Sequence, residues 1–132
     1  MAAVRELVIE MARLRHALRA LLAANEAISH AEGLTPQQYQ AMLAICAWRG
    51  PMALKDLADQ LMLKHSAAVQ LFRRLETTGF VRREVSAVDR RVVHVKLTAA
   101  GDELVVAILQ KQLREFQDRG EGLCQLIKRV QS

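Results

Sequence analysis

The sequence predicts a mainly α-helical domain with one small β-hairpin, in a chain of 132 residues. Most apolar residues recur at helical spacings of three and four, whereas only two short segments are rich in β-branched residues. Hydrophobic residues make up 52% of the chain, which is enough for one core and for a subunit interface as well. We therefore expect a single domain.

Composition argues against several classes of protein. No stretch of roughly 18 residues is both apolar and free of charge, and Arg5 and Glu6 interrupt the N-terminus too early for a secretory signal. We therefore expect a cytoplasmic protein with no membrane partner. The only cysteines, Cys46 and Cys124, are far apart and have no further ligands at metal-binding spacing, which excludes a disulfide framework and a zinc ribbon.

A long first helix is expected over residues 3–30. The other faces of this helix carry many Arg and Glu residues, so one narrow stripe does the packing. Such a stripe either meets a partner subunit or packs within its own subunit, and we favour the partner. The stripe alternates spacings of four and three through three heptads, with one polar interruption, at Leu7, Met11, Leu14, Leu18, Leu21, Asn25 and Ile28.

A second helix is expected from Thr35 to about Trp48, after residues 31–33 break the first pattern. Thr35 is a suitable N-cap, Pro36 suits the first helical position and Gln38 suits the third. These local signals define the start of the helix better than its end.

Two short helices joined by a tight link are expected next. Residues 52–54 are long enough only for a fragment at a sheet edge, and the short helix after them lacks a good N-cap. The following helix is expected to begin near Ser66 as its N-cap and to end at Gly79. Its core face is Ala68, Leu71, Phe72 and Leu75.

The periodicity then changes from helix to strand. Residues 80–85 and 92–97 are β-branched runs, and the basic segment between them forms the tip of a hairpin. Thr98 is expected to cap a last long helix. Gly120-Glu121-Gly122 is expected to break that helix before a short amphipathic tail.

This order of elements is that of a winged helix-turn-helix at about 35–97, flanked by dimerisation helices at about 3–30 and 98–131. In this arrangement the second short helix enters a DNA major groove and the hairpin tip reaches adjacent backbone or minor groove. Residues 64–96 cover both elements and hold eight of the 19 Lys/Arg but three of the 14 acids. A solvated basic face would show the same excess, but the coincidence favours double-stranded DNA as partner.

Several side chains on the second short helix are candidates for DNA contacts. Gln70 bonds bidentately to adenine and Arg73 to guanine, so both suit base edges. Lys64, His65 and Ser66, at the start of the helix, suit phosphate instead. Arg74 also lies on the outward face, as a further DNA-binding candidate.

At this point the chain resembles the MarR (multiple antibiotic resistance regulator) family. Residues 89–101, DRRVVHVKLTAAG, are similar to its wing signature, D-x-R followed by L-T-x-x-G. Residues 74–81, RLETTGFV, are similar to its R-L-E-x-x-G-[LF]-[VI] motif at the end of the recognition helix. With both motifs in register, the resemblance covers nearly the whole chain. It implies a homodimer whose terminal helices interlock and whose subunits each occupy half of a pseudo-palindromic operator.

The resemblance also implies roles in the wing. Arg91 would reach into a minor groove, whose focused negative potential favours a guanidinium, and Asp89 would pair with nearby arginines to hold the wing in shape. Arg90 would meet phosphate or solvent. This chain departs from the family pattern in its short wing tip at residues 86–88, which lacks glycine, and in the few hydrogen-bonding groups on its recognition helix.

The sequence therefore predicts a sequence-specific transcriptional regulator, acting as a repressor and associated with the nucleoid through DNA. The alternative is a winged-helix protein-interaction module, or a MarR-like partner that does not itself bind DNA. Catalysis and cofactors are not expected, because the chain has no glycine-rich phosphate loop, nucleophile elbow or paired carboxylates.

The resemblance implies a small-molecule effector of unknown identity. Tyr39, Met42, Cys46 and Trp48 lie on or near one helix that could line its pocket, but such spacing is more typical of a core, so no ligand residue is assigned. Cys46 is expected to be a buried, unreactive thiol. The histidines are scattered over separate elements, so a metal site is unsupported.

Overall fold

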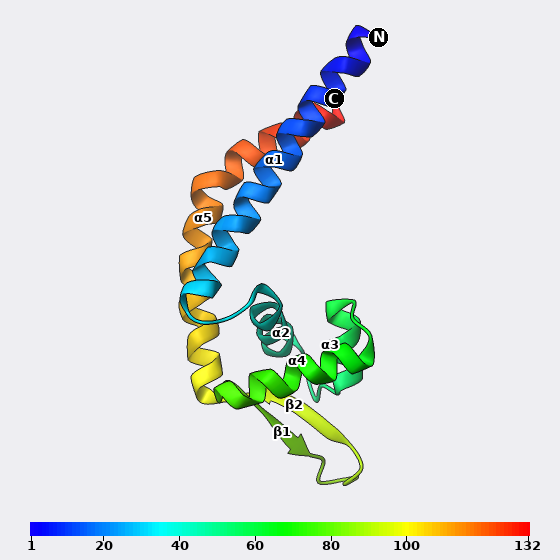
Figure 1. Ribbon diagram of the computed structural model, residues 1–132, viewed down its shortest axis with the longest axis vertical. Coiled ribbons are helices and arrows are strands. Elements are labelled where there is room, and N and C mark those ends of the chain that lie inside the picture. The colour runs from blue at the N-terminus through cyan, green and yellow to red at the C-terminus, as the bar shows by residue number, and fades with distance from the viewer. The chain divides into compact units, whose positions relative to one another are not determined.

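The computed structural model describes all residues from Met1 to Ser132. Five helices and one antiparallel hairpin confirm the predicted fold class (Figure 1). None of the helices combines the length and apolar character needed to cross a bilayer. The elements are α1 (Ala2–Ala31), α2 (Pro36–Ala47), α3 (Leu54–Leu61), α4 (His65–Thr78), β1 (Val81–Val85), β2 (Val93–Leu97) and α5 (Ala99–Gln131).

The chain divides into two compact units. One comprises residues 33–107 and holds α2, α3, α4, the hairpin and the start of α5. The other comprises residues 1–32 and 108–132, which are α1 and the rest of α5. The predicted winged helix-turn-helix elements thus all lie in the first unit.

The core of the 33–107 unit lies where α2, α3 and α4 meet the base of the hairpin. α3 contacts α2 and α4, while β1 contacts α4 and β2 contacts α2. The side chains buried there include Met42, Leu57, Phe72, Leu75 and Val95, none more than 2% exposed. Burial of these large apolar groups is the main stabilising contribution to the unit.

Side-chain caps set the starts of α2 and α3. The Thr35 hydroxyl accepts the Gln38 N–H at 3.1 Å, and the Gln38 side chain accepts the Thr35 N–H at 3.0 Å, as the sequence predicted. The sequence offers no good N-cap residue for α3. In the structure the Asp56 carboxylate supplies the cap instead, accepting the Ala53 N–H at 2.9 Å.

A short segment before α3 joins the sheet edge, as expected. Val95 donates its N–H to the Met52 carbonyl at 2.8 Å, and Ala53 forms an isolated bridge with His94. The hairpin pairs Val81 with Leu97 at its base. Each strand begins one residue later than predicted, at 81 and 93 rather than 80 and 92.

The prediction that Ser66 caps α4 was wrong. Lys64 is the N-cap and α4 begins at His65, so Ser66 lies in its first turn. Met62 ends α3 in the left-handed region, at φ 53°, and one extended residue at Lys64 then suffices to start the next helix. No side chain caps the first amides of α4.

The end of α4 is tied to the start of α5. Gly79 ends α4 at φ 81°, a left-handed conformation that suits glycine. The Thr98 hydroxyl donates to the Gly79 carbonyl at 2.6 Å and accepts the Gly101 N–H at 3.1 Å. The Thr98 N–H donates to the Phe80 carbonyl at 2.9 Å. Thr98 therefore caps α5, as predicted, and also fixes the chain reversal after α4.

The predicted break in the last helix was also wrong. α5 continues to Gln131, and neither Gly120 nor Gly122 has a positive φ. Each helical glycine lowers helix stability by about 1 kcal/mol relative to alanine. This cost is small for a long helix that contains no proline. Leu123 and Leu126 line a hollow that residues of α1 also line.

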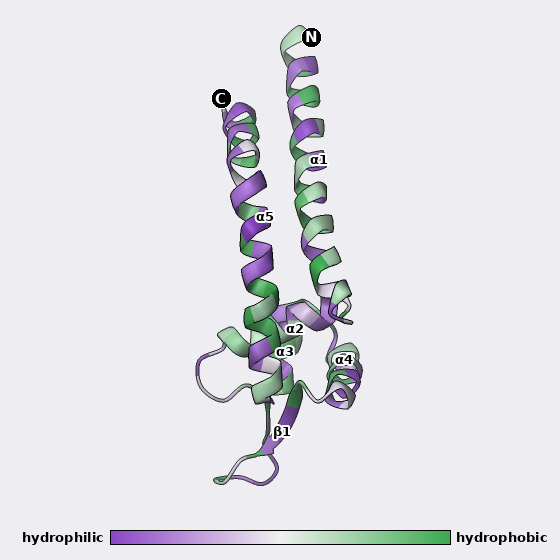
Figure 2. Cartoon of the chain, turned by 90° about the vertical axis from the view of Figure 1, so that its left-hand side faces the viewer, coloured by the Kyte–Doolittle hydropathy of each residue, from purple (hydrophilic) through white to green (hydrophobic).

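Polar contacts join the two helices of the other unit. The Gln112 amide donates to the Asn25 carbonyl at 3.2 Å, and Lys111 pairs with Glu32 at 3.0 Å. Hydrophobic residues recur along both helices, shown green in Figure 2. Many of them have no cover, including Leu7, Met11, Leu18, Leu109, Leu113, Phe116 and Ile127, all at least 39% exposed.

Replacing Tyr39 by phenylalanine is expected to raise the free energy of unfolding by about 1 kcal/mol. Tyr39 is 5% exposed, and its buried hydroxyl has no hydrogen-bond partner. Burial raises the pKa of this hydroxyl above its ordinary value, with a further contribution from Cys46. Urea unfolding followed by circular dichroism measures the change. A loss of stability in the variant would show that the hydroxyl has a partner.

Candidate nucleic-acid interface

The two faces of α4 are divided as the sequence predicted. Ala68, Leu71, Phe72 and Leu75 are buried. On the outward face, Gln70 lies one turn after Ser66 and less than one turn before Arg73. The exposed side chains here include all the DNA-contacting candidates predicted at this helix, Lys64, His65, Ser66, Gln70, Arg73 and Arg74.

Half of the cations in the basic segment are neutralised within the chain. Four of its eight Lys/Arg pair with its three acids: Arg82 and Lys96 with Glu84 at 2.9 and 3.3 Å, Arg83 with Glu76 at 3.0 Å, and Arg91 with Asp89 at 3.3 Å. The other four, Lys64, Arg73, Arg74 and Arg90, make no ion pair. These four free cations all belong to the predicted DNA-contacting set.

The paired cations of the strands have structural partners. Arg82 and Lys96 lie opposite each other in the hairpin register, and both bond to Glu84. Hydrogen bonds from these two side chains hold the pKa of Glu84 below its ordinary value. Arg83 also stacks over the Phe72 ring, with its guanidinium carbon 5.6 Å from the ring centre, which joins the hairpin base to α4.

Asp89 organises the wing tip. Its Oδ1 accepts the Arg91 backbone N–H at 3.0 Å and Nε at 3.3 Å, while Oδ2 accepts from the same guanidinium at 3.4 Å. The Ser86 hydroxyl accepts the N–H groups of Val88 and Asp89, at 3.2 and 3.4 Å. The Arg91 side chain nevertheless remains 91% exposed. The tip thus presents an oriented guanidinium to solvent.

The contact between Asp89 and Arg91 is expected to persist from neutral pH down to below pH 3.8, the ordinary pKa of an aspartate. Hydrogen bonds from the Arg91 backbone and side chain lower the pKa of Asp89. A lowered pKa means that the stabilising contact is complete above the ordinary value and is lost as pH falls through the shifted value. NMR titration of the Arg91 amide measures this, with Asp89→Asn as control. A midpoint above 3.8 would contradict the prediction.

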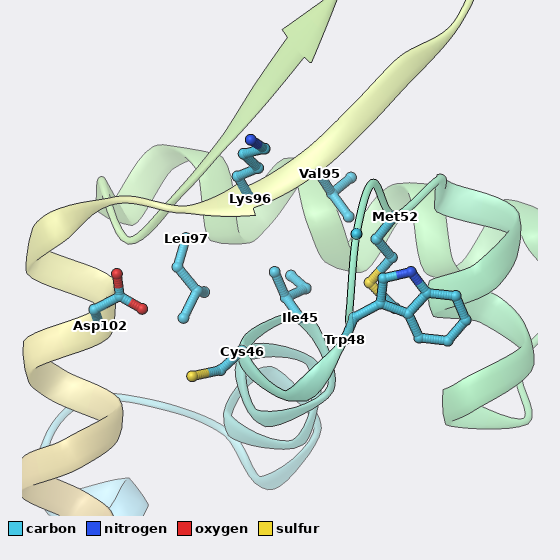
Figure 3. A pocket seen from close by; sticks show the side chains of 9 residues that line it. Ile45, Cys46, Trp48, Met52, Val95, Lys96, Leu97 and Asp102 are labelled. Carbon is cyan, nitrogen blue, oxygen red and sulfur yellow. The ribbon is translucent and has the colours of Figure 1, made fainter. Parts of the chain in front are cut away.

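Cys46 is exposed, so the prediction of a buried thiol was wrong. Met42 and Ile45 lie on the buried face of α2. Cys46 follows Ile45 by one residue and therefore lies on a different face of the helix, outside the core. A hollow of about 220 Å³ opens here between the end of α2, β2 and the first turn of α5. Figure 3 shows the Cys46 thiol facing the Asp102 carboxylate there.

The other residues on or near α2 that could line a ligand pocket do not all lie at one place. Tyr39 and Met42 belong to the core, as helical spacing favoured, whereas Trp48 lines the hollow beside Cys46. The Trp48 indole donates to the Pro51 carbonyl at 3.2 Å, which fixes the turn after α2. The histidines form no group of three or more metal-ligating side chains with one another or with Cys, Asp or Glu.

Comparison with known proteins finds a family match for part of this chain. Residues 32–92 match the model of the MarR family. The HTH-type transcriptional repressor MdtR of Bacillus subtilis is 32% identical over 71 residues, which are 54% of this chain and 45% of MdtR. The chain spans about half the length of the curated relatives it matches.

Solved structures share the architecture. AbsC, a MarR-family transcriptional regulator of Streptomyces coelicolor, is 25% identical with a TM-score of 0.70, over 87% of this chain and 82% of AbsC. A MepR variant of Staphylococcus aureus bound to an oligodeoxyribonucleotide is 19% identical with a TM-score of 0.70, over 88% and 94%. Residues 32–92 of this chain are therefore similar to the MarR family.

Proposed function

We propose that this chain is a transcriptional regulator that binds double-stranded DNA in a sequence-specific manner and represses by occupying a promoter. The observation that carries the proposal is that the four free cations of the basic segment lie on α4, at its N-cap and at the wing tip. These are the two elements with which a winged helix contacts DNA. Affinity then comes largely from phosphate neutralisation.

The recognition helix α4 supplies both kinds of contact. Gln70 and Arg73 reach base edges in the major groove, where they suit adenine and guanine respectively. Arg74 and Lys64 neutralise phosphates beside the groove. The uncapped amides at the start of α4, with the side chains of His65 and Ser66, add phosphate contacts favoured by the helix dipole.

The wing supplies a second contact. Arg91 enters the minor groove next to the major groove that holds α4, and Arg90 meets the flanking phosphates. Asp89 fixes the direction in which the Arg91 guanidinium leaves the tip, because it bonds to both the backbone and the side chain of Arg91. Preorganisation of this kind reduces the entropy lost on binding.

We also propose a homodimer on a pseudo-palindromic operator. The uncovered apolar residues of α1 and α5 are the surface that a second subunit would bury. Leu7, Met11 and Leu18 repeat at coiled-coil spacing and are exposed in the single chain. The DNA-bound MepR variant shows that this fold can hold DNA, and the name of MdtR supports repression. Light scattering at micromolar concentration tests the dimer.

A salt titration of DNA binding tests the proposed function. Fluorescence anisotropy is measured with random-sequence duplexes and with the DNA upstream of the chain's own gene. A dimer that places three free cations per subunit on phosphates, Lys64, Arg74 and Arg90, gives a slope of about −5 in log K against log salt. Tighter binding to the upstream DNA supports a specific regulator, and binding to neither at low salt supports the protein-interaction alternative. The double variant Arg73→Ala with Arg74→Ala, which removes two of the free cations from α4, is measured beside the wild type in the same titration.

A further inference from the structure

The wing tip carries an apolar surface that the fold does not cover. Along the hairpin, Val81 and Val95 are 3% and 1% exposed because they face the core. Beyond them the same kind of side chain is left in solvent: Val85 is 56%, Val92 38% and Val88 98% exposed. The hairpin extends away from α2, α3 and α4 (Figure 1), and the exposed fractions of these valines show that they are left largely uncovered.

Cations border this apolar surface. Arg90 makes no ion pair and follows Val88 by two residues, while the Arg91 side chain is 91% exposed. The acids nearby are already paired, since Asp89 bonds to Arg91 and Glu84 bonds to two other cations. The fitting partner therefore has an apolar surface flanked by negative charge.

The minor groove of DNA has this chemistry. Its walls are the carbon faces of deoxyribose, its rims are phosphates, and it is only about 6 Å wide, so a narrow hairpin tip fits better than a helix. Sugar contacts are common in protein–DNA interfaces. Valine suits such a contact because its β-branched side chain is stiff and loses little freedom on burial.

We infer that Val88, together with Val85 and Val92, packs against the deoxyribose walls of the minor groove that Arg91 enters. This inference rests on the proposed function. The Ser86 hydroxyl accepts the N–H groups of Val88 and Asp89, which holds the apolar contact and the guanidinium in one rigid tip. The short tip without glycine, at residues 86–88, is thereby suited to contact rather than to flexibility.

The test compares variants of Val88 on a duplex selected by the wild type from a random pool. Val88→Ser is expected to weaken binding about fivefold, for partial loss of an apolar contact, with the salt slope unchanged. Arg91→Ala is expected to weaken binding and to reduce the salt slope, because it removes a charge. Val88→Ile is expected to restore wild-type affinity, and Ala87→Ser, at the neighbouring exposed position, to change it less than twofold.

The outcomes separate this inference from the proposed function. Because Val88 is 98% exposed, its variants should keep the wild-type melting temperature, which circular dichroism verifies. If Val88→Ser binds as tightly as the wild type while Arg91→Ala binds weakly, the apolar contact is overturned and DNA binding stands. The tip valines would then be left for a protein partner. If the wild type selects no DNA, the proposed function fails and this inference fails with it.

Discussion

Replacing Gly101 by alanine is expected to lower the free energy of unfolding by about 3 kcal/mol or more. A Cβ at this position would overlap the Phe80 carbonyl oxygen and lie 3.0 Å from its carbon. The carbonyl cannot withdraw freely, because it accepts the Thr98 N–H and because Thr98 also holds the Gly79 carbonyl. The clash is therefore between two backbone segments, where rotation of a side chain gives no relief.

Gly120→Ala in the same helix is the matched control. Nothing lies within 4 Å of a Cβ at Gly120, and its φ is not positive. Alanine here should raise the free energy of unfolding by about 0.5–1 kcal/mol, because glycine loses more backbone entropy in a helix. Urea unfolding of both variants should thus give shifts of opposite sign. If Gly101→Ala left the free energy of unfolding unchanged, the junction between α4 and α5 would have to relax around the added methyl group.

Sequence reasoning succeeded where the signal is local. Thr35 and Thr98 cap helices through residues within one turn of the chain, and Gly79 ends a helix through its own left-handed conformation. The position of each was predicted correctly. The inward face of α4 was likewise predicted, because helical spacing alone determines which side chains share a face. The hairpin was predicted to within one residue at the start of each strand.

Sequence reasoning failed where the outcome depends on packing. The glycines at 120 and 122 suggested a break, but both keep a negative φ and α5 runs through them without interruption. Ser66 is a better cap than Lys64, yet the preceding left-handed Met62 determines where α4 begins. Cys46 stands in an apolar stretch, but its position relative to Ile45 places it outside the core.

The DNA-contacting roles of the candidate site residues stay predictions, and the sequence did not reveal the division between free and paired cations. Arg83 pairs with Glu76, seven residues away and on another element, so no local rule reveals the contact. The Glu84 contacts were accessible in principle, because a hairpin register that faces Arg82 with Lys96 brings both next to it. Pairing determines which charges are left for phosphate.

Arg91→Ala is expected to weaken DNA binding by about tenfold or more, the effect of losing one charge-assisted contact at a desolvated site. The guanidinium is 91% exposed in the free chain and is already oriented by Asp89, so little ordering opposes its insertion. Its removal also leaves the Asp89 carboxylate unpaired beside DNA phosphates. The double variant Asp89→Asn with Arg91→Ala should therefore bind more tightly than Arg91→Ala alone.

Arg82→Ala is the matched control, because it removes the same charge from the same hairpin. Its guanidinium is bonded to Glu84 at 2.9 Å and lies on β1 rather than at the exposed wing tip, so its loss should weaken binding less than about threefold. Replacing guanine by inosine removes the amino group from the minor groove and leaves the major-groove edge unchanged. Wild type and Arg82→Ala should prefer the inosine duplex, and Arg91→Ala should not. Equal losses for both arginines would mean that the wing acts through net charge and not through insertion.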